Sequence, residues 1–221
     1  MNAKPIFCFD SKDFQRVKEI DSFWSGKLQN PAVSADNFQN KTSEELLDLI
    51  KETDITVVFI GKYTFESEKC LRTIEESFKT GKAFLAVYLD NAEDVKKSGK
   101  EVLGKNPFDL FYFEYKNGVT TLNKGAVVLP GKLKRRILSK EIKAKADFIR
   151  VYDYVKDRGH ENLMKWIEEE YIRKEDFWAQ CGKINENEWQ TALKITNQGG
   201  IAGMFLYYDW VKYSKSNENE S

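Results

Sequence analysis

The sequence predicts an α/β protein whose parallel sheet is covered by helices on both faces. Three consecutive segments carry this prediction. Residues 55–60 form an unbroken apolar run rich in β-branched side chains, residues 67–80 have the spacing of a helix that ends at Gly81, and residues 83–89 form a second apolar run. Strands that are apolar on both sides are typical of buried parallel sheets. A strand–helix–strand order of this kind forms a right-handed crossover.

The segments before residue 55 continue the same alternation. Residues 5–9 are apolar and predict the first strand, and residues 10–28 follow with apolar side chains at helical spacing. Residues 31–37 are short and mixed, which predicts a weak edge strand. Thr42 and Glu45 have the spacing of a capping box, so a further helix is expected to begin there.

The segments after residue 90 are less regular. Residues 93–105 are charged and contain glycines, which predicts a surface excursion, and residues 108–115 predict a strand. Asn117 and Gly118 then form a strong hairpin signal, with a return strand at 119–122. From Lys132 to Gly159 the apolar positions predict helix. Further helices are expected at 161–171, 174–180, 187–196 and beyond Gly200.

These segments predict three parts of the chain. We expect an α/β domain at residues 1–130, a helical C-terminal extension packed on it at 131–213, and a disordered tail at 214–221. The tail offers almost no apolar side chain that could pack against a core.

The composition argues against several classes of protein. Lys+Arg and Asp+Glu number 35 each in a chain of 221 residues, so the net charge gives no reason to expect nucleic acid or an acidic membrane as partner. The basic run from Lys132 to Lys145 is interpreted as a solvated helix face. A single histidine, His160, and scattered cysteines do not form the pattern of a metal site.

The compartment follows from the cysteines and the apolar runs. The three cysteines are odd in number and far apart, which fits free thiols in a reducing cytoplasm. The first residues lack the apolar core of a signal peptide, and no apolar run reaches the length of a membrane span. We therefore expect a cytoplasmic protein without a membrane segment.

Candidate binding residues follow the first two central strands. Ligands of open parallel sheets bind where the strands end. Asp10 and Ser11 follow the first strand and could contact ribose or phosphate, or simply cap the next helix. Gly61, Lys62 and Tyr63 follow the second strand. They could line a nucleotide pocket, with Tyr63 stacking on a base, or form an ordinary surface loop.

Several stretches in one order resemble a known family. Residues 55–65, a helix that ends at Gly81, and residues 84–89 resemble the TIR-like domain of the Thoeris anti-phage defence family, the ThsB-type proteins. The opening stretch 7–10, the stretch 106–109, and the stretch 148–155 with Gly159 and Trp166 fit the same pattern. The resemblance covers about residues 5–167.

The resemblance implies a flavodoxin-like fold and an activity on NAD. Members of the family cleave NAD at the glycosidic bond to nicotinamide, and the ADP-ribose product becomes a signal that activates an effector. NAD would then be a substrate or bound nucleotide rather than a cofactor. The implied partners are NAD or an NAD-derived nucleotide and an effector of the same defence system, and a homo-oligomer is left open. The expected nucleotide-binding residues are Phe9, Asp10, Ser11, Gly61, Lys62, Tyr63 and Thr73.

The chain departs from the family at the implied catalytic position. The family has a glutamate early in the helix after the Gly61 loop, whereas Thr73 occupies that place here and Lys69 replaces an aromatic residue. A neutral hydroxyl cannot stabilise the positive charge that develops on the ribose as nicotinamide leaves. Glu76, three residues further on, is the best-placed substitute, ahead of Glu66, Glu68 and Glu75.

Two functions are therefore predicted. In the first, the protein is an NAD glycohydrolase or ADP-ribosyl cyclase that uses Glu76. In the second, it is a catalytically degenerate TIR-like module that acts as a sensor or scaffold through nucleotide or protein binding.

Overall fold

The computed structural model describes residues 3–25, 34–89, 104–116, 119–125, 135–138, 141–145 and 149–181. The chain divides into two compact units. One unit contains Met1–Ser77, Lys82–Pro107 and Ile149–Lys174, and the other contains Phe78–Gly81, Phe108–Phe148 and Glu175–Ser221.

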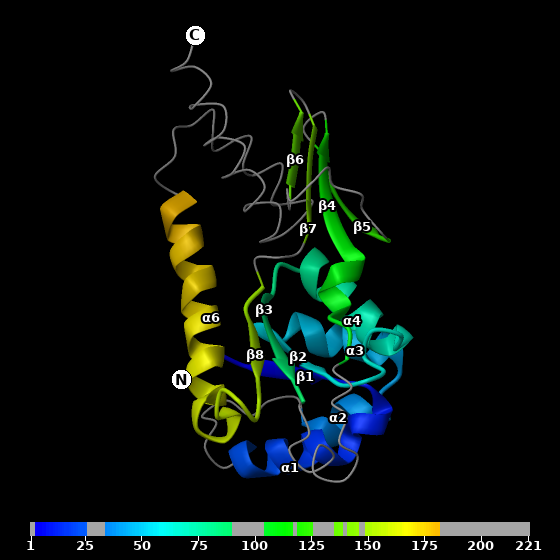
Figure 1. Ribbon diagram of the computed structural model, residues 1–221, viewed down its shortest axis with the longest axis vertical. Helices are drawn as coiled ribbons and strands as arrows, with labels where there is room; N and C mark the ends of the chain where they lie inside the picture. The colour runs from blue at the N-terminus through cyan, green and yellow to red at the C-terminus, as the bar shows by residue number, and fades with distance from the viewer. Residues whose placement is uncertain are drawn as a thin grey trace. The chain divides into compact units, whose positions relative to one another are not determined.

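The first unit is built on a four-stranded parallel sheet. Its strands are β1 (Pro5–Cys8), β2 (Ile55–Ile60), β3 (Ala83–Tyr88) and β8 (Val151–Asp153), in the order β1-β2-β3-β8 (Figure 1). Every residue of β1 and β2 is buried, and so is every residue of β3 except Tyr88. The predicted parallel sheet with two covered faces is therefore confirmed.

Helices cover both faces of this sheet. The strand register places Thr56 of β2 on one face, where its hydroxyl donates a hydrogen bond of 2.8 Å to Ser77 of α4 (Glu68–Lys79). The same register aligns Phe59 with Val87 and Tyr152 on the opposite face. There Tyr152 stacks on Trp166 of α6 (Gly159–Cys181), with ring centroids 4.2 Å apart. The architecture is the flavodoxin-like arrangement that the sequence predicted.

The elements that the structure describes between β1 and β2 are all helical. A 3₁₀ turn, η1 (Ser11–Asp13), leads into α1 (Phe14–Ser25), and α2 (Ala35–Asn40) and α3 (Ser43–Lys51) follow. The predicted capping box starts α3. The Thr42 amide donates to Glu45 Oε2 at 2.8 Å, and the Glu45 amide donates to Thr42 Oγ1 at 3.3 Å.

The second unit contains an antiparallel sheet in the order β5-β4-β7-β6. Its strands are β4 (Phe111–Lys116), β5 (Val119–Lys124), β6 (Arg135–Leu138) and β7 (Glu141–Lys145). Lys116 pairs with Val119, so β4 and β5 form the predicted hairpin. The turn residues 117–118 themselves lie outside the described residues.

The structure corrects the helix predicted between Lys132 and Gly159. The described residues of this segment form β6, β7 and β8, followed by turns that lead into α6 at Gly159. Ile137 and Ile142 are two of the apolar positions on which the helix prediction for this segment rested, but they pair directly across β6 and β7. The basic run therefore contributes two strands, and the interpretation as a solvated helix face is wrong for Arg135–Leu138 and Glu141–Lys145.

Two smaller predictions also change. The weak edge strand at 31–37 is wrong where it is described, because Ser34 caps α2 and Ala35 begins that helix. The two helices predicted at 161–171 and 174–180 are one continuous helix, α6. The helices predicted after residue 187 and the disordered tail lie outside the described residues. The domain limits at 130 and 213 stay predictions.

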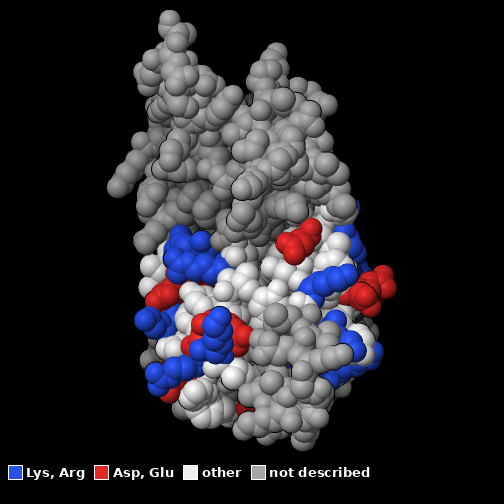
Figure 2. Space-filling view, in the orientation of Figure 1, with Lys and Arg blue, Asp and Glu red and all other residues white. Residues whose placement is uncertain are grey.

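Charge on the described surface is mixed in sign. Figure 2 shows basic and acidic side chains next to one another over the described part of one face, as expected for a chain with 35 residues of each sign. Within the part of the chain that the structure describes, no helix is both long and apolar enough to cross a bilayer.

Candidate functional site

The carboxyl ends of β1 and β2 bring most of the predicted binding residues together. The two strands are parallel neighbours, so the residues that follow them meet at one edge of the sheet. Asp10 caps η1 by accepting a hydrogen bond of 3.1 Å from the Lys12 amide. The Lys12 ammonium lies 3.4 Å from the ring centroid of Tyr63, in the loop after β2. Segments 10–13 and 61–66 therefore form one surface, which we call the strand-end site.

The loop after β2 is folded tightly against the sheet. The Gly61 amide donates to Thr64 Oγ1 at 2.9 Å, and that hydroxyl donates to the Phe59 carbonyl at 3.2 Å. Thr64 is fully buried. A Cβ on Gly61 would lie 1.9 Å from Asp13 Oδ2, and a Cβ on Gly104 would lie 2.0 Å from the Gly61 carbonyl oxygen. Glycine is therefore required at both positions, because a side chain would collide with these atoms.

Asp13 connects the segments that follow three strands, a role that the sequence analysis did not predict. Its Oδ1 pairs with Arg16 at 3.1 Å, and Arg16 also donates to the Leu89 carbonyl after β3. The Asp13 side chain is 8% exposed. Its Oδ2 has no hydrogen-bond partner among the described residues. Burial raises the pKa of Asp13, and the charge of Arg16 partly offsets that rise.

Three exposed lysines meet aromatic rings of the same loop. Lys12 and Lys62 lie 3.4 and 5.3 Å from the centroid of Tyr63. Lys105, next to Gly104, lies 5.4 Å from the centroid of Phe65. These distances are within the range of cation–π attraction. The sequence analysis identified Lys62 and Tyr63 but missed Lys12 and Lys105, because their proximity to the loop comes from the tertiary fold.

Phe9 belongs to the core and not to the surface of the strand-end site. It is 1% exposed. Its ring lies 5.0 Å from Phe38 of α2 and 6.3 Å from Phe14 of α1, measured between centroids. Phe9 can therefore support the neighbouring residues Asp10 and Ser11, but its own side chain is not exposed to a ligand.

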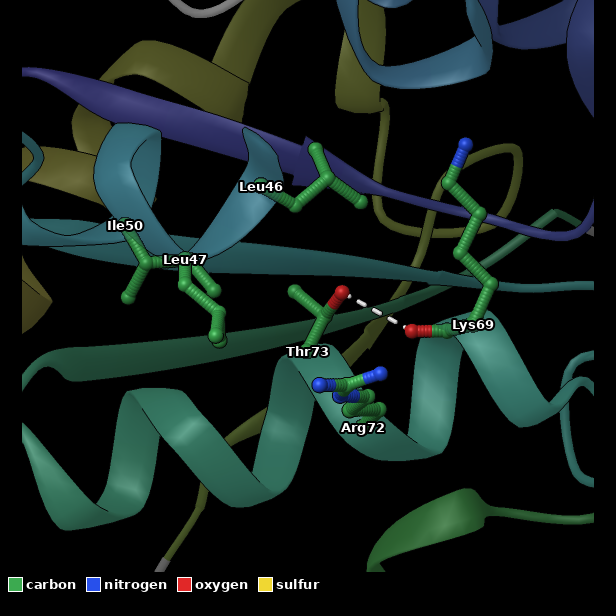
Figure 3. A pocket seen from close by; sticks show the side chains of 6 residues that line it. All are labelled: Leu46, Leu47, Ile50, Lys69, Arg72 and Thr73. Carbon is green, nitrogen blue, oxygen red and sulfur yellow. Dashed lines mark hydrogen bonds between the residues drawn. The ribbon is translucent and has the colours of Figure 1, made fainter. Parts of the chain in front are cut away.

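Thr73 lies in a separate groove between α3 and α4. The groove measures about 170 Å³ including the open solvent above it, less than the roughly 300–1,000 Å³ of typical ligand pockets. Thr73 is 2% exposed, and its hydroxyl donates to the Lys69 carbonyl at 2.8 Å (Figure 3). We call this place the α3–α4 groove. Its lining residues are Leu46, Leu47, Ile50, Lys69, Arg72 and Thr73.

Lys69 anchors α2 to α4. Its ammonium donates to the carbonyl oxygens of Phe38 and Gln39 at 2.5 and 3.1 Å. These carbonyls belong to the last turn of α2, where a cation is favoured by the helix dipole. Burial lowers the pKa of Lys69. Lys69 thus holds the two helices together next to Thr73.

The two cysteines next to Thr73 lie in buried surroundings. Cys8 and Cys70 are free and fully buried. Burial raises the pKa of the Cys8 thiol well above its usual value, and the neighbouring Cys70 adds to the rise. Since the thiolate is the reactive form, neither geometry nor ionisation favours Cys8 as a nucleophile.

Glu76 does not reach the strand-end site. Helix α4 begins at Glu68 after the Gly61 loop and leads towards the amino end of β3. At 1.5 Å per residue, Glu76 lies roughly 12 Å along the helix axis from Glu68. The side chain is half-buried. Its predicted catalytic role therefore depends on a ligand that reaches this far along α4.

The surroundings of the single histidine bear on whether a metal site is present. His160 is exposed and lies 3.2 Å from Glu161. No group of three or more His, Cys, Asp or Glu side chains is arranged to hold a metal ion in the described ranges.

Comparison with known proteins finds a family that part of the chain resembles. No curated protein matches the chain. Residues 7–94 match the family model described as Thoeris protein ThsB, TIR-like domain. The match runs from within β1 to just beyond β3, and so includes the strand-end site and Thr73. That family implies a defence system with partner effector proteins. Residues 7–94 are therefore similar to the TIR-like domain of the Thoeris anti-phage defence proteins.

Proposed function

We propose that this protein is a nucleotide-binding TIR-like module of an anti-phage defence system that has lost the family's helix-borne catalytic acid. It binds NAD or an NAD-derived nucleotide at the strand-end site and acts as a sensor or scaffold for an effector partner. The observation that carries the proposal is Thr73. The position where the resemblance implies a glutamate holds a buried neutral hydroxyl that is bonded to the Lys69 carbonyl.

The chemistry of nicotinamide release explains why this substitution matters. Positive charge develops on the ribose, and a nearby carboxylate stabilises it. The Thr73 hydroxyl can supply only a dipole, and its proton is already used within the helix. The groove around it is also small and lined on the α3 side by Leu46, Leu47 and Ile50. These side chains favour packing between helices over a charged reaction.

The strand-end site keeps features that suit binding. It lies where ligands of open parallel sheets are found, and it presents Asp10 and Ser11, at the start of η1, on the same edge of the sheet as Lys62 and Tyr63. Gly61 allows the loop to approach Asp13 closely. A nucleotide could therefore bind at this edge even though position 73 provides no acid.

A second function is favoured by the location of Glu76. It lies on α4 three residues after Thr73, hence on a neighbouring part of the same helix surface, and it is half-buried. In this alternative Glu76 replaces the missing glutamate and the protein processes NAD into an ADP-ribose-type signal. The displacement of about 5 Å along the helix is its main difficulty, because catalytic groups tolerate errors of only about 0.5 Å.

One experiment separates the two functions. The purified full chain is incubated with NAD, alone and together with the proteins encoded beside it, and nicotinamide release and NAD binding are both measured. The proposed module binds NAD or ADP-ribose and releases no nicotinamide in either setting. Release that Glu76→Gln abolishes and Glu75→Gln leaves intact would establish the processing function. Neither binding nor release would overturn both.

A further inference from the structure

We propose that Lys12, Lys62 and Lys105 form a phosphate-binding site for the diphosphate group of a nucleotide, and that Tyr63 and Phe65 position their ammonium groups. The inference rests on the proposed function and deepens it. It names the part of the ligand that the strand-end site recognises.

The three lysines come from separate segments that converge on one loop. Lys12 lies in η1 after β1, Lys62 lies in the loop after β2, and Lys105 follows Gly104. The tight approach between Gly104 and the Gly61 carbonyl brings the third segment to the loop. The fold thus gathers three positive charges around residues 61–66.

These lysines lack a carboxylate partner among the described residues, whereas several other exposed lysines have one. Lys4, Lys18, Lys41, Lys51 and Lys165 each form an ion pair with an aspartate or glutamate. In the described ranges no such pair is found for Lys12, Lys62 or Lys105. Their recorded contacts are with aromatic rings, at 3.4 and 5.3 Å from Tyr63 and 5.4 Å from Phe65. Their charge therefore remains available to an anion.

The acidic residues nearby do not cancel this charge by direct contact. Asp13 is paired with Arg16, and Asp10 accepts the Lys12 amide, not its ammonium. Glu66 and Glu68 are exposed at the end of the loop and form no recorded ion pair with these lysines. An anion that approached the two rings would meet the ammonium groups first.

The aromatic rings give the site its geometry. A lysine side chain in solution samples many rotamers, and ordering it costs free energy on binding. Contact with a ring face restricts the ammonium before the ligand arrives, as in other preorganised sites. The arrangement also changes the expected role of Tyr63. Because Lys12 already lies over its ring, Tyr63 holds the cations and does not offer that face to a base.

Two adjacent phosphates fit such a site better than one. Lys12 and Lys62 contact the ring of Tyr63, and Lys105 contacts Phe65, the next aromatic residue of the loop. Charges spread along a short loop match an anion that is itself extended. The diphosphate that NAD and ADP-ribose share has this form.

The test measures binding of ADP, inorganic pyrophosphate and adenosine to the full chain by calorimetry at two salt concentrations. Pyrophosphate and ADP should bind, more weakly at high salt, and adenosine should not. Lys12→Gln, Lys62→Gln and Lys105→Gln should each weaken ADP binding roughly threefold to fivefold, the scale of one exposed ion pair. Lys51→Gln on α3, also exposed, is the matched control and should leave affinity unchanged.

Substitutions of the ring test the positioning role. Tyr63→Phe keeps an aromatic face and should retain affinity, whereas Tyr63→Leu should reduce it and lower the salt dependence. Equal affinity for ADP and adenosine, or lysine variants indistinguishable from Lys51→Gln, would overturn the inference. Pyrophosphate binding without any binding of NAD would support this site and contradict the proposed function. NAD binding that none of the three lysine substitutions weakens would support the proposed function and contradict this phosphate-binding site.

Discussion

The strand-end site and the α3–α4 groove differ in which side chains they expose. At the strand ends, backbone segments approach closely and leave charged side chains exposed around the Gly61 loop. In the groove, the Thr73 hydroxyl donates a hydrogen bond to the Lys69 carbonyl of its own helix, and leucine and isoleucine side chains line the opposite side. The proposed function thus assigns binding and bond cleavage to different residues, and it retains only the residues for binding.

The largest effect is expected from Gly61→Ala. A Cβ at this position would lie 1.9 Å from Asp13 Oδ2, so the loop or the aspartate must move. Unfolding in urea should show a loss of about 2–4 kcal/mol, the range for overpacking combined with a broken buried contact. Lys62→Ala is the control beside it, and its cost should stay within about 0.5 kcal/mol. An unchanged midpoint for Gly61→Ala would show that this close approach does not contribute to stability.

The next largest effect is expected from Thr73→Glu, which restores the residue type that the resemblance implies. Placing a carboxylate in the groove removes it from water without a partner, and should destabilise the fold by about 2–3 kcal/mol. Thr73→Val keeps the shape and removes one hydrogen bond, so it should cost about 1 kcal/mol or less. Thr73→Glu should still release no nicotinamide. A stable variant that cleaves NAD would mean that the groove is a dormant active site.

A smaller effect is expected from Lys69→Met. The substitution keeps most of the side-chain volume but removes the cation from the last carbonyls of α2. The loss should be about 1 kcal/mol in thermal unfolding. Arg72→Met, on the same helix and also lining the groove, is the comparison and should cost less. A larger cost at Arg72 would contradict the anchoring role of Lys69.

The smallest effect concerns pH at Asp13. Its pKa in the folded protein is raised by burial, so the folded state binds a proton more tightly than the unfolded chain does. This contribution to stability is present at low pH and is lost as pH rises from the usual carboxyl range through the raised pKa. The difference in unfolding free energy between wild type and Asp13→Asn should therefore change across that window. A flat Asp13 profile would contradict the raised pKa.

The parts of the fold that local pattern determines were predicted well. The apolar runs at 55–60 and 83–89 admit little besides buried strands, and Thr42 with Glu45 specifies a helix start in four residues. The helix prediction for the segment around Ile137 and Ile142 was wrong because a spacing of five residues is compatible both with an irregular helix and with a pair of short strands. Pairing across β6 and β7 decides the matter, and pairing is not visible in the local sequence.

The sequence predicted which segments meet at the candidate site, but not the contacts between their side chains. The topology of parallel strands is enough to bring Asp10 next to Gly61. The contact of Lys12 with Tyr63 and the pairing of Asp13 with Arg16 beside Gly61 depend on how η1 meets the loop. Those contacts are tertiary, so no spacing in the sequence indicates them.

The most direct test of the central claim is to titrate the isotopically labelled full chain with NAD and follow each backbone amide by NMR. We predict shifts at residues 10–13 and 61–66, little change at residues 46–50 and 69–76, and NAD that stays intact throughout. Shifts centred on residues 69–76 with growing signals of free nicotinamide would contradict the claim.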